Sequence, residues 1–135
     1  MGTLVVGYDR TDGARAALRE AVALGGELGD SIVVVFAYTV GRLGGEVSDY
    51  AAALHDHARE VLDDARSVGG EGVDVVELER PPAQALIEVA DERDARMIVV
   101  GSHGETPLKS VLLGSTPTKL LHLSLRPVLV VRGPD

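Results

Sequence analysis

The sequence predicts an α/β fold, an open sheet of five parallel strands with helices on both faces. Short runs rich in Val, Ile and Leu alternate with longer segments whose apolar residues recur every three or four positions. Most of the short runs are apolar at nearly every residue, as expected for parallel strands that helices cover on both sides. The resulting order β-α-β-α-β-α-β-α-β favours right-handed crossover connections.

The first strand is expected from Thr3 to Tyr8, a short run of mainly apolar and β-branched residues. The next segment has the apolar spacing of a helix with one buried face. Its apolar positions are Ala14, Ala17, Leu18, Ala21, Val22 and Leu28. Thr11 or Asp12 is expected to cap this helix, because both side chains accept hydrogen bonds from first-turn N–H groups.

The second strand is expected from Ile32 to Ala37, where five of the six residues are strongly apolar. A second helix repeats the three-and-four spacing further along the chain. Its apolar positions are Leu54, Ala58, Val61, Ala65 and Val68. Ser48 or Asp49 is expected to begin this helix, and the pair Gly69-Gly70 is expected to end it.

The third strand, from Val73 to Leu78, differs because Asp74 and Glu77 interrupt its apolar run. Such a pattern is typical of a half-exposed strand near the edge of a sheet. A third helix is expected after the pair Pro81-Pro82, since proline suits the first turn of a helix. Its apolar positions are Ala83, Leu86, Ile87 and Ala90.

The last two strands are expected from Met97 to Val100 and from Val128 to Val131, both nearly continuous in apolar residues. Between them a fourth helix is expected after Gly114-Ser115, with Leu120, Leu121 and their neighbours on its apolar face. The length of 135 residues suits one domain of common size, so residues 1–135 are expected to form a single domain.

Composition excludes several classes of function. The chain has no cysteine, which excludes a disulfide scaffold, a thiol nucleophile and cysteine-based metal sites. It has 13 basic and 21 acidic residues, a net charge of −8, and no basic patch, so we expect neither a nucleic-acid partner nor binding to anionic membranes. No apolar stretch approaches the roughly 18–20 residues of a spanning helix. The expected location is the cytoplasm.

Candidate functional residues follow the strands, because ligands of open α/β sheets bind beyond the carboxyl ends of the strands. Asp9 follows the first strand, Gly101-Ser-His-Gly104 follows the fourth, and Gly114-Ser-Thr116 begins the last helix. Glycines let backbone N–H groups approach an anion, and a helix N-terminus adds a positive dipole. Lys109, between the two glycine segments, could add a positive charge. This spacing favours an anion site, although glycines also serve simply as caps and turns.

These residues resemble the motifs of the universal stress protein family. Gly101 to Ser115 is similar to that family's nucleotide-phosphate motif, Leu4 to Asp9 to its first strand and acidic residue, and Pro127 to Arg132 to its closing strand. The resemblance covers the whole chain. It implies a Rossmann-like sheet in the order 3-2-1-4-5, an adenine nucleotide lying across the first and fourth strands, and a homodimer.

The resemblance also implies a role for individual residues. In nucleotide-binding members, Asp9 and the backbone of Gly7 would lie near the adenosine, and the backbone of Ala37 at the adenine edge. The residues implied around the phosphates are Gly101, His103, Gly104, Gly114, Ser115 and Thr116. The implied ligand is ATP, AMP or cyclic AMP, with Mg or Mn held by its phosphates.

The last strand is the expected dimer interface. In the implied order it lies at an edge of the sheet, and the run from Pro127 to Val131 has no inward charge or interior proline to protect it. Pairing of this strand with its own copy across a two-fold axis would cover the edge.

Three residues depart from the family pattern. Arg80 stands where a glycine is usual, and its side chain would either intrude into the pocket or contact a phosphate. Pro117 stands where nucleotide-binding members often have Ser or Thr, and it offers neither an N–H group nor a hydroxyl. Glu105 adds a negative charge beside the phosphate motif. We expect weaker phosphate binding, with the core motif retained.

Structural roles are the alternative for several of these residues. Asp9 can cap the following helix, and His103 can anchor its loop by a hydrogen bond. His55 and His57 do not share a helix face and are expected at the surface, and His122 is expected to flank the last helix. None of the four histidines forms a metal-binding pair of the His-Glu-x-x-His kind.

Catalytic motifs are missing from the sequence. Neither Gly-x₄-Gly-Lys-Ser/Thr nor Gly-x-Ser-x-Gly occurs, and nothing resembles an arginine finger or a defined general base. The leading hypothesis is therefore a binding protein that acts as a sensor or reserve of an adenine nucleotide. The alternatives are a dimeric interaction module that does not bind nucleotides and a slow ATPase.

Overall fold

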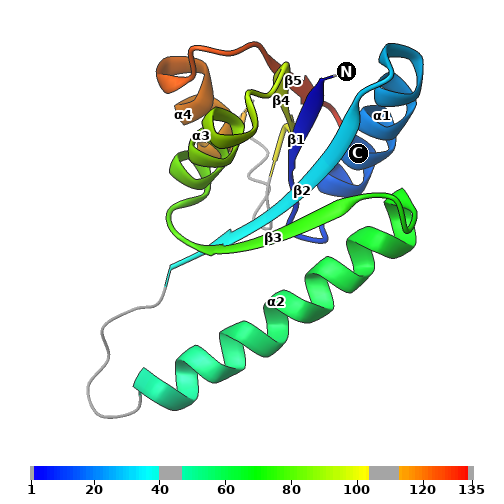
Figure 1. Cartoon of the computed structure of the whole chain (residues 1–135). Helices are drawn as coiled ribbons and strands as arrows, with labels where there is room; N and C mark the ends of the chain where they lie inside the picture. The colour runs from blue at the N-terminus through cyan, green and yellow to red at the C-terminus, as the bar shows by residue number, and fades with distance from the viewer. Residues whose placement is uncertain (1, 40–46, 104–112, 134–135) are drawn as a thin grey trace.

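The computed structural model describes residues 2–39, 47–103 and 113–133, so that Gly104, Glu105 and Lys109 lie outside the described residues (Figure 1). The elements are β1 (Thr3–Gly7), α1 (Asp12–Leu28), β2 (Ser31–Tyr38), α2 (Val47–Gly69), β3 (Asp74–Glu79), α3 (Pro82–Arg93), β4 (Met97–Gly101), α4 (Ser115–Leu123) and β5 (Val128–Val131). Each expected strand and helix is present.

The five strands form one parallel sheet in the order β3-β2-β1-β4-β5, which confirms the predicted fold class. In the middle of the sheet, Leu4 of β1 pairs with Ile32 on one side and Met97 on the other. Chain order reverses at β1, whose neighbours are β2 and β4. The carboxyl ends of β1 and β4 are therefore where a crevice is expected in a sheet of this type.

Helices cover both faces of this sheet. Because successive strand residues point to opposite faces, Leu4 and Val6 pack with α1 and α2, whereas Val5 packs with α3 and α4. Each of these three side chains is fully buried. The apolar spacing of the helices thus builds two cores, one on each face of the sheet. Figure 1 shows the helices on the two sides of the sheet.

The ends of α1 follow its sequence signals. The hydroxyl of Thr11 accepts a hydrogen bond from the N–H of Ala14 at 3.2 Å, so that Thr11 is the N-cap and Asp12 lies inside the helix. The helix ends at Gly29, whose φ of 74° lies in the left-handed region that favours glycine. Of the two expected capping residues, Thr11 is confirmed.

β3 is an edge strand, as its interrupted pattern predicts. Its first and last residues are exposed and the others are half-buried. Glu77 of β3 accepts a hydrogen bond from the Tyr38 hydroxyl at 2.5 Å and lies 2.9 Å from the Nδ1 atom of His55. These polar contacts connect α2 to the β2–β3 edge.

Three glycines bring distant backbone segments into contact at the carboxyl edge of the sheet. A Cβ atom on Gly101 would lie 2.7 Å from the carbonyl carbon and 2.8 Å from the carbonyl oxygen of Gly13. A Cβ atom on Gly133 would lie 2.8 Å from the Cα atom of Gly13. The start of α1 can therefore pack directly on the end of β4 and on the segment after β5 only because these positions carry no side chain.

No helix within residues 2–39, 47–103 and 113–133 combines the length and apolar character needed to cross a membrane.

Candidate functional site

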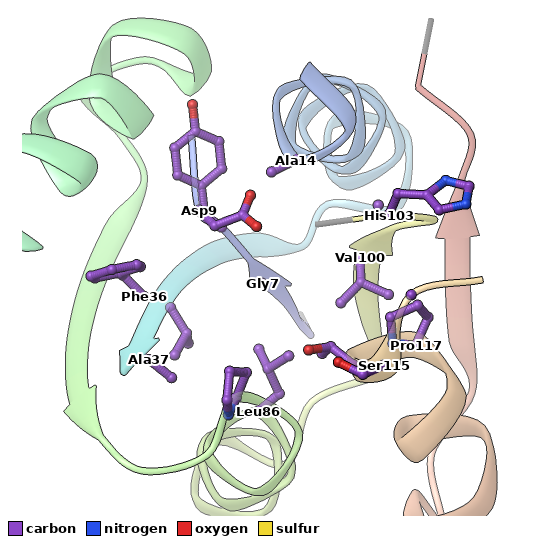
Figure 2. A pocket seen from close by; sticks show the side chains of 16 residues that line it. Gly7, Asp9, Ala14, Phe36, Ala37, Leu86, Val100, His103, Ser115 and Pro117 are labelled. Carbon is purple, nitrogen blue, oxygen red and sulfur yellow. The ribbon is translucent and has the colours of Figure 1, made fainter. Parts of the chain in front are cut away.

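A cleft opens at the carboxyl ends of β1, β2 and β4, beside the first turns of α1, α3 and α4 (Figure 2). Eight of the nine residues that the sequence analysis assigns to a site line it: Gly7, Asp9, Ala37, Gly101, His103, Gly114, Ser115 and Thr116. The ninth, Gly104, lies outside the described residues. The fold therefore gathers these eight positions in one place, and their contact with a ligand stays a prediction.

Eight further described residues line the cleft, most of them apolar, and of these the sequence singled out only Pro117, as a departure from the family's phosphate motif. They are Tyr8, Ala14, Val35, Phe36, Pro82, Leu86, Val100 and Pro117. Tyr8, Phe36 and Val100 each come directly before a residue that was predicted to belong to the site. Their position at the ends of strands is the sequence signal that could have identified them as lining residues. Gly7 lies between Leu86 and Val100, and a Cβ atom there would approach their methyl groups to 3.0 and 3.1 Å (Figure 2). The missing side chain thus lets an apolar floor form beneath the cleft.

Asp9 has a structural role and also lines the cleft. Its Oδ1 atom accepts hydrogen bonds from the N–H of Thr11 at 3.2 Å and from the Thr11 hydroxyl at 2.5 Å. Thr11 in turn caps α1. The carboxylate is thereby held in a defined position at the rim of the cleft, next to the start of α1.

Ser102 connects β4 to both neighbouring elements. Its N–H donates to the carbonyl oxygen of Val131 at 3.0 Å, and its carbonyl oxygen accepts from the N–H of Gly114 at 2.6 Å. Its buried hydroxyl lies 3.2 Å from the Nδ1 atom of His103. The N–H of Gly114 is therefore engaged within the protein, contrary to the expectation that it approaches an anion. Gly114 acts as the N-cap of α4, and its φ of −68° does not require glycine.

The first turn of α4 presents backbone donors to the cleft. The N–H groups of a first helical turn have no acceptor within the helix. Here they belong to Ser115 and Thr116, since Pro117 has no N–H and that of Thr118 donates to the Gly114 carbonyl oxygen at 3.2 Å. The helix dipole makes this end favourable for negative charge.

Arg80 is not among the described residues that line the cleft. Its Nε atom lies 3.6 Å from Oε2 of Glu88, and its guanidinium donates to the carbonyl oxygen of Glu79 at 3.1 Å. The side chain thus pairs with α3, so that intrusion into the pocket is wrong for this structure, and contact of Arg80 with a phosphate stays a prediction.

Tyr8 forms a buried wall of the cleft, and its hydroxyl donates a hydrogen bond to Asp64 of α2. Arg15 of α1 donates to both carboxylate oxygens of Asp64 at 3.2 Å. Burial acts to raise the pKa of Asp64, but the hydrogen bonds from Tyr8 and Arg15 hold this pKa below its usual value. Burial and the bond to Asp64 raise the pKa of Tyr8 well above its ordinary value. A neutral tyrosine and a charged pair therefore fix this wall to α1 and α2.

The chain matches the model of a known protein family. The model of the universal stress protein family matches residues 1–132. The chain belongs to the universal stress protein family. Among curated relatives, it is similar to the universal stress protein YxiE of Bacillus subtilis, with 32% identity covering 84% of this chain and 74% of the relative. It is also similar to the universal stress protein MJ0531 of Methanocaldococcus jannaschii, with 27% identity covering 97% and 82% of the two chains.

Solved structures share the fold of this universal stress protein. The hypothetical protein MJ0577 matches with a TM-score of 0.87 and 21% identity, covering 99% of this chain and 97% of that one. A universal stress protein in complex with cAMP matches with a TM-score of 0.71 and 26% identity, covering 98% of each chain. A universal stress protein from Archaeoglobus fulgidus in complex with dAMP matches with a TM-score of 0.70 and 25% identity, covering 97% and 98%.

Proposed function

We propose that this universal stress protein binds an adenine nucleotide in the cleft at the carboxyl ends of β1 and β4 and acts in the cytoplasm as a sensor or reserve of that nucleotide. One observation carries the proposal: an apolar floor and the N-terminal turn of α4 open into the same cleft. The relatives solved in complex with cAMP and dAMP support it.

Each part of an adenine nucleotide has a matching part of the cleft. The flat base lies on the apolar floor of Leu86 and Val100, with its edge at the backbone of Ala37. The ribose hydroxyls donate to the carboxylate of Asp9. The phosphate accepts hydrogen bonds from the first turn of α4, where the amides of Ser115 and Thr116 are available.

Two measurements test the proposal. Mass spectrometry of the small molecules released when the purified protein is denatured should show an adenine nucleotide. Calorimetry with ATP, AMP and cyclic AMP should show binding of at least one of them to the folded protein. If the folded protein releases no nucleotide and binds none of the three at millimolar concentration, the proposal fails and an interaction module without nucleotide takes its place.

Turnover of ATP is expected to be negligible beside binding. Phosphoryl transfer needs concentrated positive charge around the reacting group, and the described lining residues include no Lys or Arg. Among the described residues no group of three or more His, Asp or Glu side chains could hold a metal ion, so we propose that Mg or Mn arrives with the phosphates. Incubation with ATP and magnesium should release ADP very slowly at most. A rate of about 1 s⁻¹ that Asp9→Ala abolishes would establish an enzyme instead.

We further propose that the protein forms a homodimer through β5. Of the described strands, only β4 pairs with β5, and the side chains of Val128 to Val131 are all half-buried. Antiparallel pairing with a second copy would satisfy the backbone hydrogen-bonding groups at the open edge of β5.

Leu129→Lys is therefore expected to shift the mass in light scattering from that of a dimer towards the 14.1 kDa of one chain. Leu28→Lys, an exposed position at the end of α1, serves as the control. An Leu129→Lys protein that is folded by circular dichroism and still dimeric would place the interface elsewhere.

A further inference from the structure

The first turn of α4, at the phosphate end of the cleft, offers few hydrogen-bond donors, and Pro117 is one reason. We propose that Pro117 and the Ser102–Gly114 hydrogen bond limit this end of the cleft to one phosphoryl group. The protein would then select a nucleoside monophosphate, as a free or a cyclic ester, over a triphosphate. This inference rests on the proposed function and makes Pro117 a specificity-determining residue of the same site.

The donors at the start of α4 can be followed one by one. The N–H of Gly114 is bound to the Ser102 carbonyl oxygen at 2.6 Å. Pro117, at the third helical position, has no N–H, and the Thr118 N–H donates back to Gly114 at 3.2 Å. The donors of this turn that remain for a ligand are the amides and hydroxyls of Ser115 and Thr116. They match the oxygens of one phosphoryl group, and no further donor of this turn reaches out to a second.

Pro117 forms part of the wall of the cleft. It is buried, it lines the cleft, and it lies beside Ser115 near the end of β4 (Figure 2). Its ring occupies the place where a serine or alanine would present an N–H to the same space. Because proline is tolerated in the first turn of a helix, the fold accepts this loss of a donor without breaking α4.

The charges around the cleft also favour one phosphoryl group over a triphosphate. Arg15 of α1 pairs with Asp64 at 3.2 Å, and Arg80, between β3 and α3, pairs with Glu88 at 3.6 Å. The described lining residues include the carboxylate of Asp9 and no Lys or Arg. A triphosphate would add further negative charges that the described lining does not compensate, in a chain whose net charge is already −8. One phosphoryl group at the N-terminus of α4 avoids this repulsion.

The test compares AMP, cyclic AMP and ATP by calorimetry on the wild type, with magnesium present so that part of the charge on ATP is neutralised. We expect at least one monophosphate to bind more tightly than ATP. A preference for AMP identifies the free ester as the favoured form, and a preference for cyclic AMP identifies the cyclic ester. ATP binding as tightly as both monophosphates, or more tightly, would overturn the inference and leave the proposed function standing. Failure of all three to bind would overturn both.

Pro117→Ala and Pro117→Ser test the role of the proline itself. Pro117→Ala restores an N–H, and Pro117→Ser adds a hydroxyl as well. Because a hydrogen bond to a charged phosphate is a strong one, we expect the ratio of ATP to AMP affinity to rise about tenfold in Pro117→Ala. Leu121 of the same helix is exposed, contrary to the expectation that it lies on the apolar face, so Leu121→Ser should leave the ratio unchanged. A ratio that stays unchanged in a folded Pro117→Ala protein would overturn the assignment of Pro117.

Discussion

Gly101→Val is expected to lower the free energy of unfolding by about 3 kcal/mol, whether or not a nucleotide is present. The new Cβ atom would lie 2.7 Å from the carbonyl carbon of Gly13 and 3.1 Å from the backbone nitrogen of Ala14. All these atoms belong to the backbone of α1, so no side chain can turn away, and α1 must move off the end of β4. For a chain of this size the melting temperature should fall by about 10 °C.

Gly26→Ala is the matched control. Gly26 also lies in α1, but a Cβ atom there would meet nothing within 4 Å. Alanine in the interior of a helix is favoured over glycine, so this variant should be as stable as the wild type or more stable by up to about 1 kcal/mol. Urea unfolding followed by circular dichroism measures both variants. A Gly101→Val protein with wild-type stability would show that the contact between α1 and β4 is not tight.

Ser115→Pro is expected to weaken nucleotide binding by about 10–100-fold without unfolding the protein. Ser115 is the first residue of α4, a position where proline is common because the N–H has no acceptor within the helix. The preceding Gly114 has a ψ of 173°, an extended conformation that a following proline accepts. The substitution therefore removes a proposed phosphate donor and keeps the backbone of the turn.

Ser115→Ala separates the amide from the hydroxyl. It removes the hydroxyl but keeps the N–H, so calorimetry should show a smaller loss of affinity than for Ser115→Pro. The melting temperatures of both variants should stay close to that of the wild type. Equal affinity of Ser115→Pro and the wild type for the nucleotide would remove the first turn of α4 from the phosphate site.

The arrangement of strands and helices follows from local patterns that the sequence displays. The continuous apolar run from Val128 to Val131 matches β5 at both ends, and the charges in the third strand place β3 at an edge. The boundaries differ elsewhere by a residue or so. α2 begins at Val47 and not at Ser48 or Asp49, and β2 extends to Tyr38 beyond the expected Ala37. Backbone hydrogen bonding within the helix and between the strands, which a hydropathy pattern does not contain, sets these limits.

The site was predictable where residues follow strands directly, and less so where contacts join distant segments. Asp9 and Ser115 were found because they follow β1 and begin α4. The sequence showed Arg80 as a cation beside the pocket, but its pairing with Glu88 depends on where α3 lies. The contact of Gly13 with Gly101 joins positions with no common pattern.

Backbone packing among the three glycines also bears on how fast a ligand can bind. The start of α1 is fixed against β4 before any ligand arrives, and Asp9 is held by Thr11 in the same turn. Association therefore costs little conformational entropy on this side of the cleft, because no segment there has to become ordered. A nucleotide that binds as we propose would meet a wall already in place on the α1 side, so that its association rate would depend on diffusion and on the negative charge of the chain.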